Sequence, residues 1–112
     1  MNFISSRGYL KNLKDYKGNT VRLTDERLAH ILEHPEMANM ATAIQETLLH
    51  PEIIVQSSSD ETANLYYRYY SKTMVGEKYL CVIVKVQKDD AFILTAYLTD
   101  KIKKGKILWK AN

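Results

Sequence analysis

The hydrophobic period changes near the middle of the chain, and this change limits the possible folds more than any other feature. In residues 24–49, apolar side chains such as Leu28, Ile31 and Leu32 recur at the spacing of one helix face. From Ile53 onward, apolar and polar residues alternate with a period of two, which is typical of strands. Helices followed by strands with short turns predict an α+β fold, with two N-terminal helices packed on an antiparallel sheet.

Two helices are predicted in the first half of the chain. Thr24 is a suitable N-cap, and the two acidic residues after it favour the positive end of a helix dipole. Pro35 disfavours helical geometry at the residue before it, so the first helix is predicted to end at His34. A second helix is predicted over about residues 37–49, closed by Pro51. Its predicted inner stripe is Met40, Ile44, Thr47 and Leu48.

Four or five strands are predicted in the second half. They cover residues 53–55, 65–72, 79–87, 91–99 and 107–109. The helices are predicted to cover an aliphatic sheet face made by Leu80, Val82, Val84, Val86, Phe92, Leu94 and Ala96. The opposite face is predicted to be polar, without a second core. Its predicted members are Lys85, Thr95, Tyr97, Thr99 and Arg68.

Length and composition indicate one globular domain over all 112 residues. Hydrophobic residues make up 46% and charged residues 26%, which excludes a chain that is disordered throughout. We expect an N-terminal arm with little regular structure at residues 1–20 and a core at residues 21–110. Since no apolar run approaches a membrane span and the N-terminus lacks a signal-peptide core, we expect a cytoplasmic protein without a membrane partner.

The net charge of +3 is unevenly distributed. Residues 1–22 contain five Lys or Arg and one acid, and residues 72–112 contain nine Lys and four acids. The middle of the chain, residues 23–71, contains two Arg and eight acids. Basic ends indicate a polyanion or an acidic protein as partner. Lys101 and Lys103 begin a basic tail, which is either a solvated loop or a clamp on a nucleic-acid backbone.

Two histidines and one cysteine bear on the chemistry. His30 and His34 are four residues apart, beside Arg27, a spacing that suits either zinc ligation or two histidines on a helix surface. Ile31 stands where a zincin motif has its glutamate, and a single cysteine, Cys81, cannot form a multi-cysteine site. We therefore predict no metal and no cofactor, and we predict that Cys81 is an inert buried thiol.

Four of the eight tyrosines lie within residues 66–70. Tyr66 and Tyr70 are either a stacking surface for bases or ordinary strand residues. Arg68 between them is a cation that could bind a phosphate. Lys85 interrupts an otherwise apolar strand, so its amine must either extend over apolar surface or face a polar cleft.

An ordered set of short motifs gives the chain a family resemblance. The motifs are Val21-Arg22-Leu23-Thr24, His30-Ile31, His34-Pro35-Glu36, Pro51-Glu52-Ile53-Ile54, Tyr67-Arg68-Tyr69, Thr95-Ala96-Tyr97-Leu98-Thr99-Asp100 and Ile107-Leu108-Trp109. Together they resemble the phage-type nucleases of the barnase–EndoU–colicin–RelE fold group. The resemblance implies helices followed by a curved antiparallel sheet and a small metal-independent RNase of the toxin type. Glu33 and Leu98 depart from it, since the family often has arginine and proline there.

The resemblance implies catalytic roles for His30, His34, Arg68, Thr95, Tyr97 and Thr99. We favour His30 over His34, because His30 lies in the middle of the predicted helix, where its direction is fixed, and His34 lies in the turn before Pro35. Metal-free RNA cleavage needs a base, an acid and a cation for the transition state. The predicted substrate contacts are Arg27, Lys85, Tyr66, Tyr70, Lys101 and Lys103. The partners expected for such an endoribonuclease are RNA and a cognate antitoxin or immunity protein. The alternative is a non-catalytic RNA- or protein-binding module of the same fold.

Overall fold

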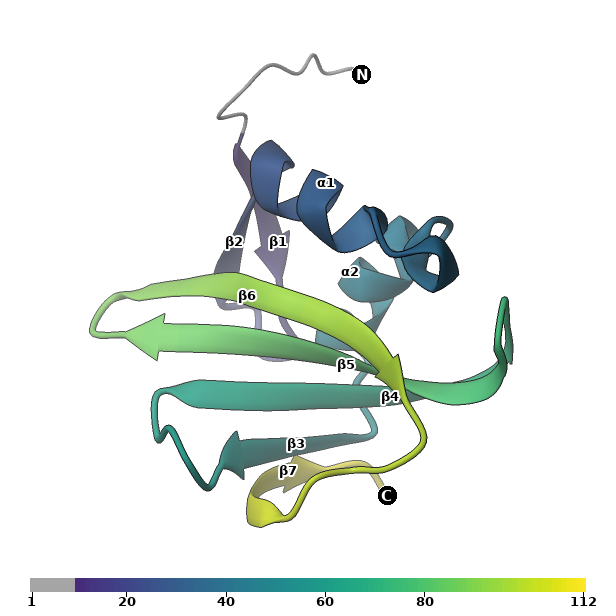
Figure 1. The fold of residues 1–112 in the computed structure, drawn as a ribbon. Helices are drawn as coiled ribbons and strands as arrows, with labels where there is room; N and C mark the ends of the chain where they lie inside the picture. Colours follow the sequence, from purple (N-terminus) through teal and green to yellow (C-terminus); the bar gives the residue numbers. More distant parts are fainter. Residues whose placement is uncertain (1–9) are drawn as a thin grey trace.

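A strongly twisted seven-stranded sheet carries the fold of residues 10–112, the part of the chain that the computed structural model describes (Figure 1). Its strands are β1 (Leu10–Lys14), β2 (Thr20–Thr24), β3 (Ile53–Ser57), β4 (Ala63–Thr73), β5 (Gly76–Gln87), β6 (Asp90–Thr99) and β7 (Gly105–Lys110). The helical elements are α1 (Asp25–Leu32), the 3₁₀ turn η1 (Pro35–Met37) and α2 (Ala41–Leu49). The strand order is β1-β2-β6-β5-β4-β3-β7, and every pair is antiparallel except β2–β6.

This architecture confirms the predicted α+β class and corrects the strand count. The additional strands come from the N-terminal region, where β1 and β2 form a hairpin. The prediction of an arm without regular structure is therefore wrong for residues 10–20, and residues 1–9 lie outside the described part. Local sequence did not reveal β1 because five residues of mixed polarity give too short a pattern to count as a strand.

The turn of the β1–β2 hairpin is fixed by a buried carboxylate. Asp15 accepts hydrogen bonds from the backbone N–H groups of Lys17 and Asn19, both at 2.9 Å. Gly18 adopts φ +85°, a left-handed conformation that favours glycine. The hydroxyl of Tyr66 donates to the Asp15 carboxylate at 3.1 Å, so a residue 51 positions away on β4 holds the turn against the sheet.

A bidentate ion pair joins the hairpin to the rest of the sheet. Arg22 and Phe92 form the registered parallel pair between β2 and β6. The Arg22 guanidinium donates to both oxygens of Asp90, at 2.7 and 2.6 Å, and lies 5.4 Å from the centre of the Phe92 ring. The hydrogen bonds from Arg22 lower the pKa of Asp90 below its ordinary value. This planar, bidentate geometry suits arginine.

The start of α1 was predicted correctly. The end of α1 and the start of α2 each differ from the predicted positions by a few residues. The Thr24 hydroxyl accepts a hydrogen bond from the Arg27 N–H at 3.0 Å, which confirms the N-cap. The helix ends at Leu32, because His34 precedes Pro35 and adopts an extended conformation with ψ 124°. The proline then starts η1, so α2 begins four residues later than predicted. All four residues of its predicted inner stripe are buried.

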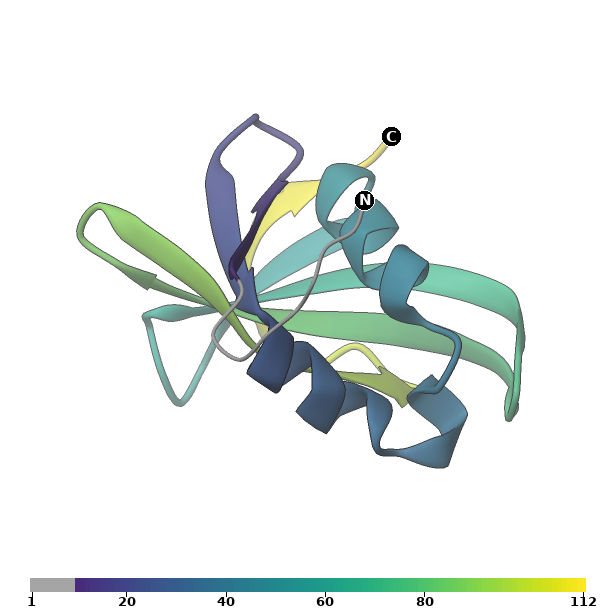
Figure 2. The same cartoon turned by 90° about the horizontal axis from the view of Figure 1, so that it is seen from above.

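The two helices sit differently against the sheet. Seen from above, α1 lies over β6, while α2 lies farther back beside the β1–β2 hairpin (Figure 2). Contacts agree with this view, since α1 touches β6 and β2 and α2 touches β5, β4 and β1. The larger core lies between the helices and the sheet, and we call it the helix-side core. Its fully buried members include Val21, Ile31, Met37, Ile44, Leu48, Ile54, Leu80, Val82, Val84 and Ile93.

A bulge in the β5–β6 pairing changes which residues of β6 face the helices. Ile83 is registered with Thr95, but Val84 is registered with Ile93, so Leu94 is an extra residue. Ile93 is consequently buried in the helix-side core at 2% exposure, and Leu94 is 36% exposed. The prediction that Leu94 points into the helix-side core is therefore wrong, because strict alternation does not continue through a bulge.

The opposite sheet face also carries a core, which the sequence did not predict. Val55, Leu65, Tyr67 and Cys81 are buried there, and we call this group the crossover-side core. Ile102 packs on it from residues 100–104, the connection between β6 and β7 that we call the crossover. Since β6 and β7 are separated by three strands in the sheet, the crossover must pass over that face and cover it.

The bulge predicts unequal losses of stability for two aliphatic truncations. Val82→Ala should lower the free energy of unfolding by about 1–4 kcal/mol, because it opens a cavity in the helix-side core. Leu94→Ala should lower it by less than about 1 kcal/mol, because that side chain is partly exposed. Urea unfolding of both variants measures the difference. Equal losses would mean that the bulge is misplaced.

Candidate active site

The polar row of β6 lies on the sheet face away from the helix-side core, as predicted. Thr95, Tyr97 and Thr99 are two residues apart on one strand and share this face. Thr95 is registered with Ile83 and Tyr97 with Cys81, so the row borders the crossover-side core. All three side chains are partly exposed. The row therefore consists of three partly exposed, hydroxyl-bearing side chains on one strand.

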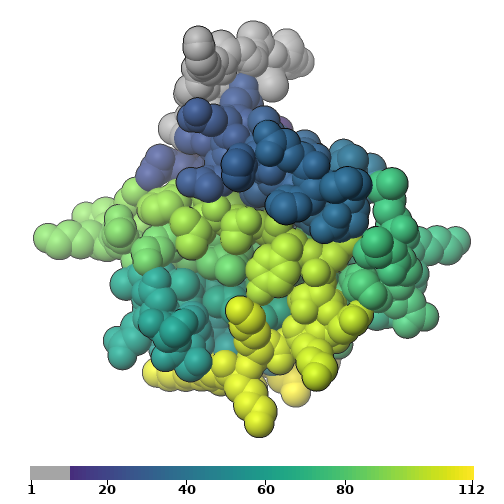
Figure 3. Space-filling model, viewed as in Figure 1, coloured from purple at the N-terminus to yellow at the C-terminus, as the bar shows by residue number. Residues whose placement is uncertain are grey.

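The crossover brings two of the predicted basic residues to the same side of the sheet. The Thr99 hydroxyl accepts from the Lys101 N–H at 3.3 Å and lies 3.2 Å from the Lys101 carbonyl, to which it donates. The Lys103 N–H donates to the Tyr67 hydroxyl at 3.1 Å, and Ile102 packs between these two points. In Figure 3 the crossover (yellow) lies on the same face as β6 (yellow-green). Both lysine side chains remain exposed beside the polar row.

Burial raises the pKa values of the hydroxyl and thiol groups under the crossover further above neutral pH. Burial raises the pKa of Tyr67 to about 12 and the pKa of the Cys81 thiol to about 11. The pKa of Tyr97 is also raised, first by burial and then by the adjacent Cys81. At neutral pH these groups are donors rather than bases. Tyr97 can therefore donate a hydrogen bond to a phosphate, and Cys81 is a buried thiol as predicted.

The two histidines lie on the helical side and are not on one helix face. The His30 side chain is 73% exposed on α1, and its Nδ1 lies 3.8 Å from a carboxylate oxygen of Glu33. His34 is exposed on the extended residue before η1. His30 and Arg27 share a shallow hollow of about 260 Å³ with Thr24 and Glu26. The predicted neighbourhood of Arg27 and His30 is thus present.

The histidines and the polar row come from elements that touch. The helix α1 contacts β6, and η1 does too. In the view of Figure 3, atoms of α1 (dark blue) border atoms of β6 (yellow-green) along the upper edge of the sheet. Within residues 10–112, no hydrogen bond or ion pair joins either histidine to Thr95, Tyr97 or Thr99. A substrate that contacts both groups must span this edge.

Arg68 lies on the other face of the sheet from Tyr97, which corrects the predicted placement. It is registered with Leu80, whose side chain lies in the helix-side core. Its Nη1 donates to the carbonyl of His50 at 2.8 Å, and its Nε lies 3.9 Å from a carboxylate oxygen of Glu46. The guanidinium is therefore held against the end of α2. Strand alternation decided this, since Arg68 and Tyr66 are two residues apart.

Tyr66 and Tyr70 accompany Arg68 on the helix side and are not an open stacking surface. Tyr66 is buried in the helix-side core, with its hydroxyl on Asp15. The Tyr70 hydroxyl donates to a carboxylate oxygen of Glu46 at 2.6 Å. Burial and this acidic neighbour raise the pKa of Tyr70 to about 12. The tyrosines are therefore structural strand residues, one of the two interpretations left open by the sequence.

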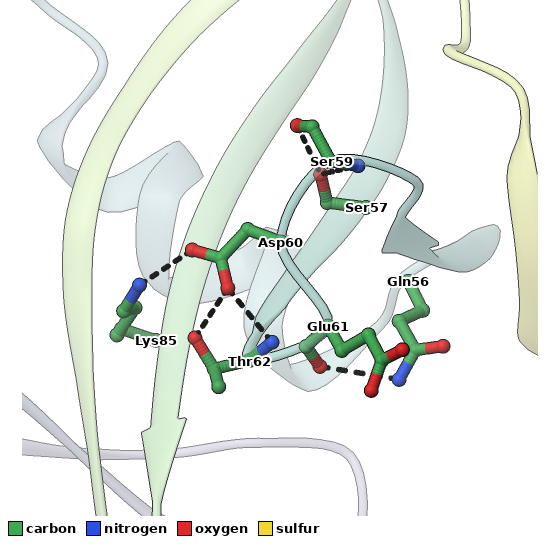
Figure 4. A network of polar contacts seen from close by, with 7 residues as sticks. All are labelled: Gln56, Ser57, Ser59, Asp60, Glu61, Thr62 and Lys85. Carbon is green, nitrogen blue, oxygen red and sulfur yellow. Dashed lines mark hydrogen bonds and ion pairs between the residues drawn. The ribbon is translucent and has the colours of Figure 1, made fainter.

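Lys85 faces a polar neighbour rather than a free cleft. Figure 4 shows its amine directed at Asp60 in the β3–β4 connection, with Nζ 2.5 Å from the carboxylate. The other Asp60 oxygen accepts from the N–H and hydroxyl of Thr62 at 3.0 and 2.6 Å. The hydrogen bond from Lys85 and those from Thr62 lower the pKa of Asp60 to about 2. Lys85 is thus already neutralised by a carboxylate.

Two further observations describe what this part of the chain contains. Within residues 10–112, no three His, Cys, Asp or Glu side chains gather in a group that could hold a metal ion. Neither of the described helices has the length and apolar composition that a membrane span requires.

Comparison with known families identifies the chain. The fold is a small α+β domain, with two helices on a mostly antiparallel sheet, a polar row on β6 and a basic crossover. A family model described as "phage-Barnase-EndoU-ColicinE5/D-RelE like nuclease2" matches residues 2–110. The chain therefore belongs to this nuclease family, which confirms the resemblance. Searches of curated proteins and of solved structures each gave no match.

Sequence reasoning missed Tyr67 and Asp60, which organise the two basic groups. Tyr67 is fully buried and holds the crossover, and Asp60 neutralises Lys85. Strand parity places Tyr67 on the face opposite Tyr66 and Arg68, which was a usable signal, but only the β4–β5 register puts it beside Cys81. No sequence signal indicates the pairing of Asp60 with Lys85, because the two residues are 25 positions apart and Asp60 lies in a loop.

Tyr67→Phe should loosen the crossover without unfolding the protein. The change removes the acceptor of the Lys103 N–H, so exchange of that amide with solvent should accelerate. The free energy of unfolding should fall by about 0.5–1.5 kcal/mol, the usual contribution of one hydrogen bond. Amide hydrogen exchange by NMR measures the first effect. Tyr79→Phe is the matched control, and equal acceleration at Lys103 in both variants would contradict the assignment.

Proposed function

We propose that the protein is a metal-independent endoribonuclease of the toxin type. Membership of a nuclease family supports nucleic acid as the substrate. The observation that carries the proposal is the polar row of Thr95 and Tyr97 on β6 beside the exposed Lys101 and Lys103 of the anchored crossover. Hydroxyl donors on a strand next to exposed cations suit a phosphodiester, because they can bind both its oxygens and its charge.

The proposed chemistry divides the reaction between α1 and β6. A histidine, with His30 favoured over His34, removes the proton of the 2′-hydroxyl or protonates the leaving oxygen, a task that suits histidine near neutral pH. Arg27, which shares a hollow with His30, binds a phosphate there. Protonated Tyr97 donates to the phosphate on β6, and Thr95 assists it. Thr99 is assigned to the crossover turn, since its hydroxyl is engaged by Lys101.

A non-catalytic RNA-binding module is the second candidate. It is favoured by the pairing of two predicted phosphate cations, Lys85 with Asp60 and Arg68 with Glu46. Charges already neutralised by carboxylates contribute less to stabilising a transition state than free ones. Both candidates predict RNA binding, and only the endoribonuclease predicts strand cleavage.

Purified protein should cleave RNA in the presence of EDTA, and His30→Ala should lower the single-turnover rate by about 10²–10⁴-fold because it removes a proton-transfer group. Tyr97→Phe should also slow cleavage by removing the donor. Gel analysis of a labelled RNA gives the rates, and thermal melts of each variant check the fold. Activity lost in EDTA and restored by zinc would contradict the metal-free mechanism.

Two comparisons sharpen this experiment. His34→Ala tests the choice of histidine, and a loss larger than that of His30→Ala would reverse the assignment. Arg68→Ala, whose guanidinium is held on the helix side, should affect stability more than the cleavage step. Wild-type cleavage by both histidine variants, with normal melting, would exclude histidine catalysis. Binding of RNA without cleavage by the wild type would establish the second candidate instead.

Expression of the intact chain in a bacterial host should arrest growth, because an unrestrained endoribonuclease depletes cellular RNA. The His30→Ala variant, expressed to the same soluble level, should be tolerated. Growth curves and total-RNA integrity measure the effect. Normal growth with abundant soluble wild-type protein would contradict the toxin role. A toxin of this kind also needs a neutralising protein, which we expect to be acidic because both ends of the chain are basic.

A further inference from the structure

The outer side of β7 has no neighbouring strand in the described part of the chain. The strand stands last in the sheet order and is paired only with β3 (Figure 1). Five of its six residues are exposed. Backbone N–H and C=O groups on such an edge can pair with an added strand. The edge therefore has the backbone chemistry needed to bind an extended peptide.

Two adjacent aliphatic side chains on β7 are exposed, one toward each sheet face. Ile107, 55% exposed, is registered with Val55 and borders the crossover-side core. Leu108, 39% exposed, is the extra residue of a bulge and lines a groove of about 650 Å³ beside the helix-side core. Tyr16 and Val86 line the same groove. An added strand could thus bury apolar surface on both of its faces.

Lysines flank these aliphatic residues on both sides. Lys104 and Lys106 precede Ile107, and Lys110 follows Trp109. Within residues 10–112, none of these three amines takes part in an ion pair, whereas Lys78 and Lys85 do. The edge is therefore positively charged at both ends, which favours acidic residues in whatever pairs with it.

We propose that β7 binds an extended acidic segment of a partner protein, which adds to the sheet as an eighth strand. The segment places two adjacent aliphatic residues against Ile107 and Leu108, the second of them entering the groove lined by Tyr16. Acidic residues before and after this pair meet Lys106 and Lys110. The partner would be the neutralising protein of the proposed toxin, so its identity rests on the proposed function. Binding of a peptide to β7 does not require that the protein cleaves RNA.

The same charges disfavour the other possible occupants. Pairing of β7 with β7 of a second copy would bring six lysines together along one edge, and like charges opposite each other destabilise a strand pair. RNA would use the lysines but would leave the backbone edge and both aliphatic side chains unpaired. An acidic strand is the occupant that uses all three features.

A synthetic peptide tests the proposal on the full-length chain, without RNA. The probe has two adjacent valines with two glutamates on each side. It should change the fluorescence of Trp109, the single tryptophan, which lies in β7. It should also slow amide exchange at Ile107 and Leu108. The same peptide with lysines for glutamates should not bind, and a copy N-methylated on alternate backbone amides should bind at least about tenfold more weakly.

Protein variants localise the site. Ile107→Asp and the double variant Lys106→Glu, Lys110→Glu should each weaken peptide binding by about tenfold or more. Val75→Asp, at a 48% exposed position on the β4–β5 turn, is the matched control and should bind normally. Absence of binding at millimolar peptide would overturn the proposal. Binding of the peptide to Ile107→Asp as tightly as to the wild type, or undiminished binding of the N-methylated peptide, would also overturn it. So would self-association of the protein through β7, or a change in Trp109 fluorescence on adding RNA but none on adding peptide.

Discussion

Burial of β5 on both of its faces is the constraint on which the other elements depend. Leu80, Val82 and Val84 face the helices and Cys81 faces the crossover, and all four are almost fully buried. A strand buried on both faces needs a layer on each side. The helices and the β1–β2 hairpin supply one layer, and the crossover supplies the other. The position of the basic crossover beside the polar row of β6 follows from this requirement.

The cations of the chain divide into structural and available groups. Arg22, Arg68, Lys78 and Lys85 are each paired with a carboxylate, and each pair joins separate elements or a loop and a strand. The lysines of the crossover and β7 are exposed and are absent from those pairs. Within residues 10–112, the exposed lysines at positions 101, 103, 104, 106 and 110 therefore form a concentration of positive charge outside these ion pairs. A modest net charge of +3 conceals this concentration.

Much of the secondary structure could be predicted because its signals are local. Thr24 caps α1 through a hydrogen bond that spans three residues, and the alternation over residues 79–87 identifies β5 by itself. The polar row of β6 followed from the same alternation. The placement of Leu94 could not be predicted, because a bulge depends on pairing with another strand. Likewise, Arg68 was placed on the wrong face because the register of β4 against β5, which puts Arg68 opposite Leu80, is not visible in the sequence.

The sequence by itself determined the α+β order, the N-cap of α1, the row of hydroxyl-bearing residues spaced two apart on β6 and the nuclease family, since these depend on local spacing and on motifs read in order. The tertiary structure alone decided which charges are free and which groups meet. Lys85 and Asp60, Tyr66 and Asp15, and Tyr67 and the crossover are brought together by strand pairing and by a chain crossing. Such contacts join residues far apart in sequence, and their geometry is set by the packed sheet rather than by local preference.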